Sequence, residues 1–279
     1  MIGSEGTLGI ITAATLKLFP LPAAQLTAWA AVPNLQSAVQ LLGLAHARLG
    51  AALTGFELMG EFALSLVAKH CQPLRVPLWQ PSVPSGGYFV LLESSDSESE
   101  QHARHQFEAL FQSAMASGCV SDAVVAENLA QARDLWHVRE SIPLAQAREG
   151  LNIKHDISIP VSRIPDFVVE TGALLQAAIP GVRLVNFGHL GDGNLHYNVQ
   201  APEGVDGQRF LLEQEERVNT LVFDQVARFA GSISAEHGVG ELKAGKLPRY
   251  KDPTALALMR AIKQALDPQN LLNPGKVLV

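Results

Sequence analysis

The order of hydrophobic and polar positions along residues 23–126 predicts strands and helices in alternation. Residues 35–49 carry apolar side chains at helical spacing and follow Asn34, a residue type that caps helices. The full predicted order is strand 25–32, helix 35–49, strand 53–58, helix 61–69, a Pro-rich loop at 73–84, strand 87–93, a helix that follows the polar run 94–100 and ends at Ser117 before Gly118, and strand 120–126. Two strand-helix-strand units predict an α+β fold: an antiparallel sheet with helices packed on one face, of the ferredoxin-like, split βαβ type.

The second half of the chain continues this alternation and ends in a helical region. Pro143 interrupts a helical pattern over residues 129–147, so we expect a kink or two helices there. The remaining predicted elements are strand 153–159, helix 162–178, strands 182–187 and 195–200, a long amphipathic helix 208–230 and a final helix 256–266. Near the start, residues 12–18 alternate as a strand would, and the prolines at 20 and 22 then break regular pairing. A domain boundary is expected at that point.

Composition and charge narrow the class of protein. The 279 residues are 47% hydrophobic, enough for a sizeable core in one large or two modest domains. Only 17% are charged and the net charge is −6, so no basic surface for nucleic acid is expected. Cys71 and Cys119 lie far apart without a CxxC spacing, which predicts no disulfide framework and a reducing compartment. There is no apolar run of membrane-spanning length and no signal peptide pattern, so we expect a globular cytoplasmic protein without a membrane span.

Two segments rich in histidine and glycine predict a metal site. His189 and His196 flank a glycine-rich turn, a spacing that excludes a shared helical face and suits the two strands of a hairpin. Glu236 lies in a second glycine-rich segment and would complete three protein ligands, with one coordination position open as in catalytic sites. Taken alone, His189 is better explained as a polar residue beside a turn, and only the combination favours a metal. Such ligands suit zinc, manganese or iron, and zinc is our first choice.

Four segments, in this order, resemble one known family. They read Gly-Ser-Glu-Gly-Thr-Leu-Gly-Ile-Ile-Thr at 3–12, Gly-His-Leu-Gly-Asp-Gly-Asn-Leu-His at 188–196, Ser-Ala-Glu-His-Gly-Val-Gly at 234–240 and Leu-Asn-Pro-Gly-Lys at 272–276. Together they resemble the C-terminal half of FAD-linked D-2-hydroxyacid dehydrogenases of the vanillyl-alcohol-oxidase type. That group includes D-2-hydroxyglutarate, D-lactate and glycolate dehydrogenases. The resemblance runs from the first residue to the last, and four matches in one order are far more specific than any single motif.

The resemblance implies a division of the chain and two cofactors. Residues 1–22 would be the remnant of an FAD-binding domain, residues 23–240 the substrate- and metal-binding domain, and residues 241–279 a helical segment that returns to the flavin domain. FAD would be held mostly by the missing N-terminal domain, so we expect this fragment alone to be inactive. The intact enzyme would pass electrons to a quinone, a cytochrome or an electron-transfer flavoprotein. A homodimer and a peripheral association with a membrane are compatible with this picture.

The resemblance also assigns roles in the oxidation of a D-2-hydroxy acid to the 2-oxo acid by hydride transfer to FAD. A metal held by His189, His196 and Glu236 would bind the substrate hydroxyl and lower its pKa. His237, adjacent to the carboxylate ligand, would accept the hydroxyl proton, because an imidazole titrates near neutral pH.

Further residues match the family's substrate and flavin contacts. Arg139 and Lys154 match its carboxylate-binding arginine and lysine. By residue type alone, Arg139 is explained equally well by an ion pair with Glu140 or Glu149, and Lys154 by a solvated strand position. The other implied contacts are Asn198 to substrate or flavin, and Gly6, Thr7, Gly9, Ile10 and Asn273 to the flavin. The Asn-Pro-Gly sequence around Asn273 is equally typical of a plain turn.

One departure from the family leaves the substrate open. Some members that take dicarboxylates have a hydroxyl residue four positions after the arginine, and here that position is Pro143. Ser141 offers a hydroxyl nearby, but its side chain would point elsewhere on a helix. The choice between D-2-hydroxyglutarate and D-lactate is therefore not made by the sequence. Two other functions also stay open. One is a metal-dependent hydrolase, although the HExxH helix is absent. The other is a catalytically silent fragment that only binds metal.

Overall fold

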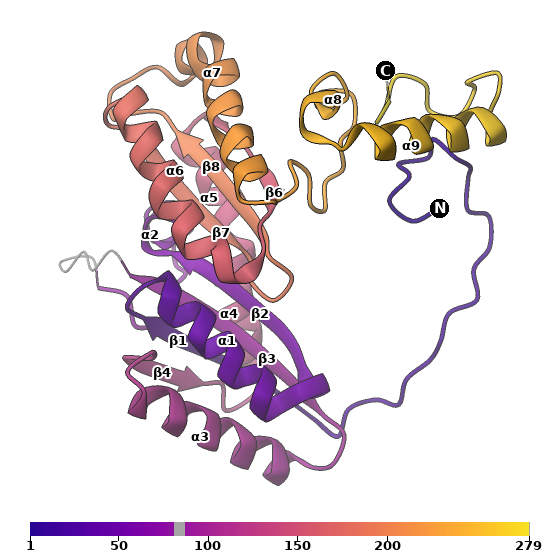
Figure 1. The fold of residues 1–279 in the computed structure, drawn as a ribbon. Helices are drawn as coiled ribbons and strands as arrows, with labels where there is room; N and C mark the ends of the chain where they lie inside the picture. Colours follow the sequence, from indigo (N-terminus) through magenta and orange to yellow (C-terminus); the bar gives the residue numbers. More distant parts are fainter. Residues whose placement is uncertain (81–86, 279) are drawn as a thin grey trace.

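Eight strands form one antiparallel sheet in the computed structural model, which describes residues 1–80 and 87–278 (Figure 1). The strands are β1 (Ala24–Val32), β2 (Leu53–Gly60), β3 (Tyr88–Asp96), β4 (Asp122–Val125), β5 (Asn152–Ile153), β6 (Asp156–Ser158), β7 (Arg183–His189) and β8 (Asn194–Gln200). Their order is β4-β1-β3-β2-β7-β8-β5, and β6 also pairs with β8. The first four strands in this order are the two interleaved strand-helix-strand units of the predicted split βαβ type. The predicted antiparallel α+β class is thus confirmed.

The helices follow the predicted order closely. They are α1 (Leu35–Leu49), α2 (Glu61–His70), α3 (Glu100–Ala116), α4 (Leu129–Glu140), α5 (Ile142–Glu149), α6 (Ile164–Ala178), α7 (Gly207–Arg228), α8 (Leu247–Tyr250) and α9 (Pro253–Leu266), with short 3-10 turns at Gly50–Ala52 and Val161–Arg163. The Asn34 side chain accepts a hydrogen bond from the Ser37 N–H at 2.9 Å, which caps α1 as predicted. Pro143 lies in the first turn of α5, so the predicted interruption is a break between two helices. Within the described residues, no helix is long and apolar enough to cross a membrane.

The helices cover both faces of the sheet, whereas the sequence pattern indicated only one. Neighbouring positions on a strand point to opposite faces, and both Val90 and Leu91 of β3 are fully buried, in different hydrophobic clusters. The first cluster joins one face to α1, α3, α6 and α7. The second joins the other face, which includes Trp29, to α2, α4 and α5. This second layer matters for function because it carries Arg139 at the end of α4.

Two predicted strands differ from the structure. Residues 12–18 contain no strand, because no neighbouring strand within the described ranges pairs with them; this stretch runs as an open trace toward β1 (Figure 1). The predicted strand 153–159 is divided into β5 and β6. Between them, the backbone N–H of His155 donates to the side chain of Asn198 on β8 at 3.0 Å instead of to a backbone carbonyl of that strand. The division places Asp156 opposite His196 on β8.

The N-terminal residues pack against the C-terminal helical region, and both chain ends lie beside α9 (Figure 1). The Lys263 ammonium on α9 donates to the backbone carbonyls of Thr7 at 2.9 Å and Leu272 at 2.8 Å. The Asn273 side chain donates to the backbone carbonyl of Glu5 at 2.6 Å. Sequence segments from the two ends of the chain therefore form one contact region.

Candidate metal centre and substrate pocket

The β7–β8 hairpin places two histidines at one edge of the sheet. His189 is the last residue of β7, and His196 on β8 pairs with Phe187 of β7. The tight turn depends on Gly193, which has a φ of 81° and where a Cβ atom would lie 2.3 Å from the carbonyl oxygen of Ile159. The rings of His189 and His196 lie 6.4 Å apart between centroids. The predicted hairpin arrangement of the two histidines is present.

The loop that carries Glu236 is held against β6 by one buried carboxylate. The Asp156 Oδ2 atom accepts hydrogen bonds from the backbone N–H groups of Ala235, Glu236 and His237 at 3.1, 3.0 and 2.8 Å. Its Oδ1 atom accepts another from the Asn194 side chain at 2.8 Å. Burial alone would raise the pKa of Asp156, but these hydrogen bonds outweigh it and lower the pKa. Asp156 is thus an organiser of the loop.

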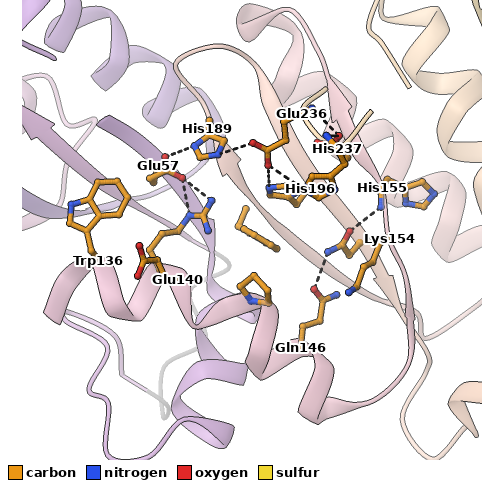
Figure 2. A pocket seen from close by; sticks show the side chains of 15 residues that line it. Glu57, Trp136, Glu140, Gln146, Lys154, His155, His189, His196, Glu236 and His237 are labelled. Carbon is orange, nitrogen blue, oxygen red and sulfur yellow. Dashed lines mark hydrogen bonds and ion pairs between the residues drawn. The ribbon is translucent and has the colours of Figure 1, made fainter. Parts of the chain in front are cut away.

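The Glu236 carboxylate lies among three imidazoles (Figure 2). Its Oε1 atom is 3.2 Å from His196 Nε2 and 3.4 Å from His237 Nε2, and its Oε2 atom is 3.6 Å from His189 Nε2. In a tetrahedral site with bonds of about 2.0 Å, neighbouring ligand atoms are about 3.3 Å apart. The donor types are those of a divalent metal site, and the distances from Glu236 to His196 and His237 lie closest to this spacing, whereas His189 lies farther away. Among the described residues, the ligand atoms that all lie within 4.8 Å of one another belong to Asp156, His196, Glu236 and His237, and the predicted ligand His189 is not in this group. Both Asp156 oxygens already accept hydrogen bonds, one from Asn194 and the other from the loop.

The two histidines of the hairpin have different electrostatic environments. A hydrogen bond from His189 Nδ1 to the Glu57 carboxylate at 2.5 Å raises the pKa of His189. Burial, together with the charge of Arg139, lowers the pKa of His196 to about 4. His196 is therefore neutral at neutral pH, with a lone pair free for a metal. The His237 ring stacks on that of His196, with centroids 5.3 Å apart and planes at 28°.

A cavity of about 470 Å³ opens beside this cluster. It is lined by all the residues predicted to bind metal or substrate or to act as the base, namely His189, His196, Glu236, His237, Arg139, Lys154 and Asn198. They come from β7, β8, α4, the segment between β5 and β6, and the loop after α7 (Figure 2). Residues scattered over a hundred positions of sequence thus meet in one pocket of a size suited to a small molecule.

The three predicted substrate residues have different surroundings in this pocket. Arg139 is buried and pairs with Glu57, not with Glu140 or Glu149, the partners that residue type alone suggested. Lys154 is exposed, and no residue in the described ranges pairs with its ammonium group. Both ends of the Asn198 amide are engaged: Oδ1 accepts from His155 N–H at 3.0 Å, and Nδ2 donates to Gln146 at 2.9 Å.

The predicted flavin residues lie outside this cavity, in the contact region between the chain ends. Gly6 lies against Asn273, since a Cβ atom at Gly6 would be 3.8 Å from the Asn273 side chain. Thr7 is buried, while Ile10 is 79% exposed; Gly9 lies between them. Glu5 links this region to the metal loop, because its carboxylate accepts 2.7 Å hydrogen bonds from the N–H groups of Val239 and Gly240.

Four residues that hold predicted groups of the site were missed at the level of sequence. Glu57, Gln146, His155 and Asp156 all line the cavity, and each forms a hydrogen bond with a group that the sequence had identified. Glu57 carried a usable signal, since it is an isolated carboxylate in the apolar run Phe-Glu-Leu-Met at 56–59. His155 and Asp156 directly follow Lys154, but only the register of β6 against β8 gives Asp156 its role.

The family of the chain follows from comparison with known proteins. A family model described as FAD linked oxidases, C-terminal domain, matches residues 21–277, and the chain belongs to this family. D-2-hydroxyglutarate dehydrogenase of Xanthomonas citri pv. viticola is 39% identical over 277 residues, which are 99% of this chain and 56% of that protein. The mitochondrial D-2-hydroxyglutarate dehydrogenase of Arabidopsis thaliana is 36% identical over 278 residues, 99% of this chain and 47% of that protein. The chain thus spans about half the length of these curated relatives.

Solved structures share the fold at low sequence identity. p-Cresol methylhydroxylase with substrate bound matches with a TM-score of 0.64 at 12% identity, over 92% of this chain and 53% of that one. 4-Ethylphenol oxidase from Gulosibacter chungangensis matches with a TM-score of 0.60 at 14% identity, over 95% of this chain and 55% of that one. These likenesses concern the fold alone.

Proposed function

We propose that this chain is the substrate domain of a flavin-dependent, metal-assisted dehydrogenase that oxidises a D-2-hydroxy acid to the 2-oxo acid. The observation that carries the proposal is the shared cavity, in which the histidine-carboxylate cluster of His189, His196 and Glu236 lies with the cations Arg139 and Lys154. A 2-hydroxy acid carries a hydroxyl, which a metal in the histidine-carboxylate cluster would bind, and a carboxylate, which the two cations would bind. The curated relatives named as D-2-hydroxyglutarate dehydrogenases match 99% of the chain and support the same reaction.

The residues of the pocket divide the work of binding and proton transfer. His189, His196 and Glu236 would hold a divalent ion, for which we favour zinc over manganese or iron. An ion held there would supply a Lewis acid for the substrate hydroxyl, and FAD would supply the acceptor for the hydride of the carbon that bears this hydroxyl. His237 is the proposed base: its ring lies at the rim, 65% of its side chain is exposed, and its Nε2 faces the same carboxylate as the other imidazoles. This exposure lets it pass the proton to solvent.

Arg139 and Lys154 are the proposed anchors for carboxylate groups. The Nε atom of Arg139 donates to Glu57 at 2.8 Å, and its Nη2 atom forms an ion pair with the same oxygen at 2.8 Å; within the described ranges its Nη1 atom has no hydrogen-bond partner. The Lys154 ammonium group is exposed in the cavity and, within the described ranges, is not paired, so it can bind a carboxylate. Asn198 is proposed to contact the substrate through its second amide hydrogen, since one already goes to Gln146. Two separate cations favour an acid with two carboxylates, and we propose D-2-hydroxyglutarate ahead of D-lactate.

We place the flavin on the side of the contact region between the chain ends. Gly6, Thr7, Gly9, Ile10 and Asn273 are its proposed contacts. This placement is supported by the hydrogen bonds of Glu5, which join the contact region to the loop that carries Glu236 and His237. A flavin bound in the contact region would therefore lie near that loop. Residues 1–22 would accordingly belong to the flavin domain, residues 23–240 to the substrate and metal domain, and residues 241–279 to the segment that returns to the flavin domain.

Anaerobic reduction of bound FAD tests the function on the full-length protein that carries this chain. D-2-Hydroxyglutarate should bleach the yellow flavin absorbance, D-lactate should do so less efficiently, and the L-enantiomers serve as controls. Full-length, flavin-loaded protein that no D-2-hydroxy acid reduces would contradict the proposal. Hydrolysis of an ester or amide by the same metal-loaded preparation would then favour the hydrolase.

A further inference from the structure

One buried carboxylate connects the candidate metal ligand His189 to the candidate anchor Arg139. The Glu57 Oε1 atom lies 2.5 Å from His189 Nδ1 (Figure 2). Its Oε2 atom lies 2.8 Å from both Nε and Nη2 of Arg139. The Glu57 side chain is only 5% exposed. Its position follows from the sheet, because Glu57 on β2 is the direct cross-strand partner of His189 on β7.

The contact with Glu57 determines which nitrogen of His189 carries the proton. An ionised carboxylate only accepts hydrogen bonds, so Nδ1 must be the protonated nitrogen in this pair. The lone pair of the neutral ring is then on Nε2, the atom that faces Glu236 at 3.6 Å. Carboxylates that bind the second nitrogen of a metal-ligating histidine in this way fix its tautomer and ring orientation.

The second oxygen of Glu57 fixes the guanidinium of Arg139. The Nε–H group of Arg139 donates to this oxygen and its Nη2 atom lies 2.8 Å from it, while the guanidinium carbon lies 4.9 Å from the centre of the Phe187 ring. That ring in turn contacts His196, with centroids 4.7 Å apart. Both acceptor oxygens of Glu57 are thus used by groups that line the cavity, one on the side of the metal cluster and one on the side of the anchor.

We infer that Glu57 is a positioning residue that holds the His189 tautomer for metal binding and orients Arg139 for a carboxylate, so that both halves of the pocket depend on one side chain. The inference rests on the proposed metal site. It does not require Glu57 to contact metal or substrate, since both of its oxygens are occupied by protein donors.

The most informative substitution is Glu57→Gln. Its single carbonyl oxygen can serve Arg139, which has no acceptor atoms, and the NH2 group then faces His189. To accept that hydrogen bond, Nδ1 must lose its proton, and the proton moves to Nε2, where it blocks the metal. Glu149→Gln is the matched control: the Glu149 side chain is also mostly buried and pairs with an arginine and a histidine, Arg183 and His70, in addition to Lys69, and it does not line the cavity.

Two measurements on the purified chain test the inference without enzyme activity. Competition with a chromophoric chelator gives the zinc affinity, which we expect to be about 10- to 100-fold weaker in Glu57→Gln and unchanged in Glu149→Gln. Nitrogen-15 shifts of the imidazoles report the tautomer, which should be Nδ1–H for His189 in the metal-free wild type and Nε2–H in Glu57→Gln. Equal zinc affinity in wild type and Glu57→Gln, or an unchanged His189 tautomer, would overturn the inference. Equal losses in both variants would do the same.

The outcomes separate this inference from the proposed function. If the wild-type chain binds no zinc, manganese or iron, the proposed metal site fails, while the tautomer measurement still tests Glu57 in the metal-free chain. If Glu57→Gln does not fold, Glu57→Asp keeps the charge but is shorter by one methylene and cannot reach both partners. At least tenfold weaker zinc binding by Glu57→Asp then supports the inference, and wild-type affinity overturns it.

Discussion

The carboxylate of Glu5 accepts a 2.7 Å hydrogen bond from the backbone N–H of Gly240, 235 positions later in the chain. Its other oxygen accepts from the N–H of Val239 at the same distance. Gly238 leaves room for this contact, because a Cβ atom there would lie 2.7 Å from the carboxyl carbon of Glu5. The N-terminal motif is thereby joined to the loop that carries Glu236.

Removing this link should loosen the loop after Glu236 locally. Hydrogen bonds to a charged group contribute about 1.5–3 kcal/mol each, so in Glu5→Ala the amide hydrogens of Val239 and Gly240 should exchange at least about tenfold faster. Hydrogen exchange followed by NMR measures this. The control is Glu241→Ala, which removes an exposed ion pair with Lys276. Equal exchange in wild type and Glu5→Ala would show that the link does not hold the loop.

His196→Ala should remove most of the bound metal. The ring is mostly buried and its Nε2 atom faces Glu236 at 3.2 Å, so no solvent molecule easily replaces it. Elemental analysis of the purified chain checks this, with His105→Ala on the exposed face of α3 as the control. An unchanged metal content in His196→Ala would reject the proposed ligand set.

Arg139→Ala should raise KM for a D-2-hydroxy acid in the flavin-containing enzyme. Loss of charge-assisted hydrogen bonds to a carboxylate costs about 1.5–3 kcal/mol, or roughly 10- to 100-fold in kcat/KM. Steady-state kinetics measure the effect, and Arg133→Ala on the exposed side of α4 is the control. A fall in kcat with an unchanged KM would contradict the anchoring role.

The stability of the chain should fall at acidic pH because of His155. Complete burial lowers the pKa of His155 to about 4, whereas an unfolded histidine titrates near pH 6.5. As the pH falls below about 6.5, the unfolded state therefore takes up the proton first, and stability present above that pH is lost progressively down to about pH 4.

The contribution of His155 can be isolated with His155→Gln, which carries no titrating ring. Between about pH 7.5 and pH 5, this histidine should account for about 2 kcal/mol of lost stability. Urea unfolding at the two pH values measures the loss, which should be smaller by that amount in His155→Gln than in wild type. His105→Gln should keep the wild-type difference. The same pH difference in His155→Gln and wild type would show that His155 is not responsible.

Local elements were predictable wherever one periodicity extended over a whole segment. Helix α1 begins and ends at the predicted residues, after its predicted cap Asn34, and Pro143 separated α4 from α5 as its chemistry requires. The prediction of a strand at residues 12–18 was wrong, because alternation of apolar and polar residues is not sufficient for a strand. A strand also needs a neighbour to pair its backbone groups, and none of the described strands lies beside this segment.

The sequence by itself determined most of the strands and helices and the residue types that can bind metal and carboxylate, because periodicity, turn chemistry and donor atoms are local properties. Only the tertiary structure decided which of them act together. Glu57 contacts Arg139 and His189, which are 82 and 132 positions away in the sequence. The sequence pattern also did not indicate that the helix with Arg139 packs on the second face of the sheet. Such contacts depend on strand order and register, which bring distant residues together and which no local pattern encodes.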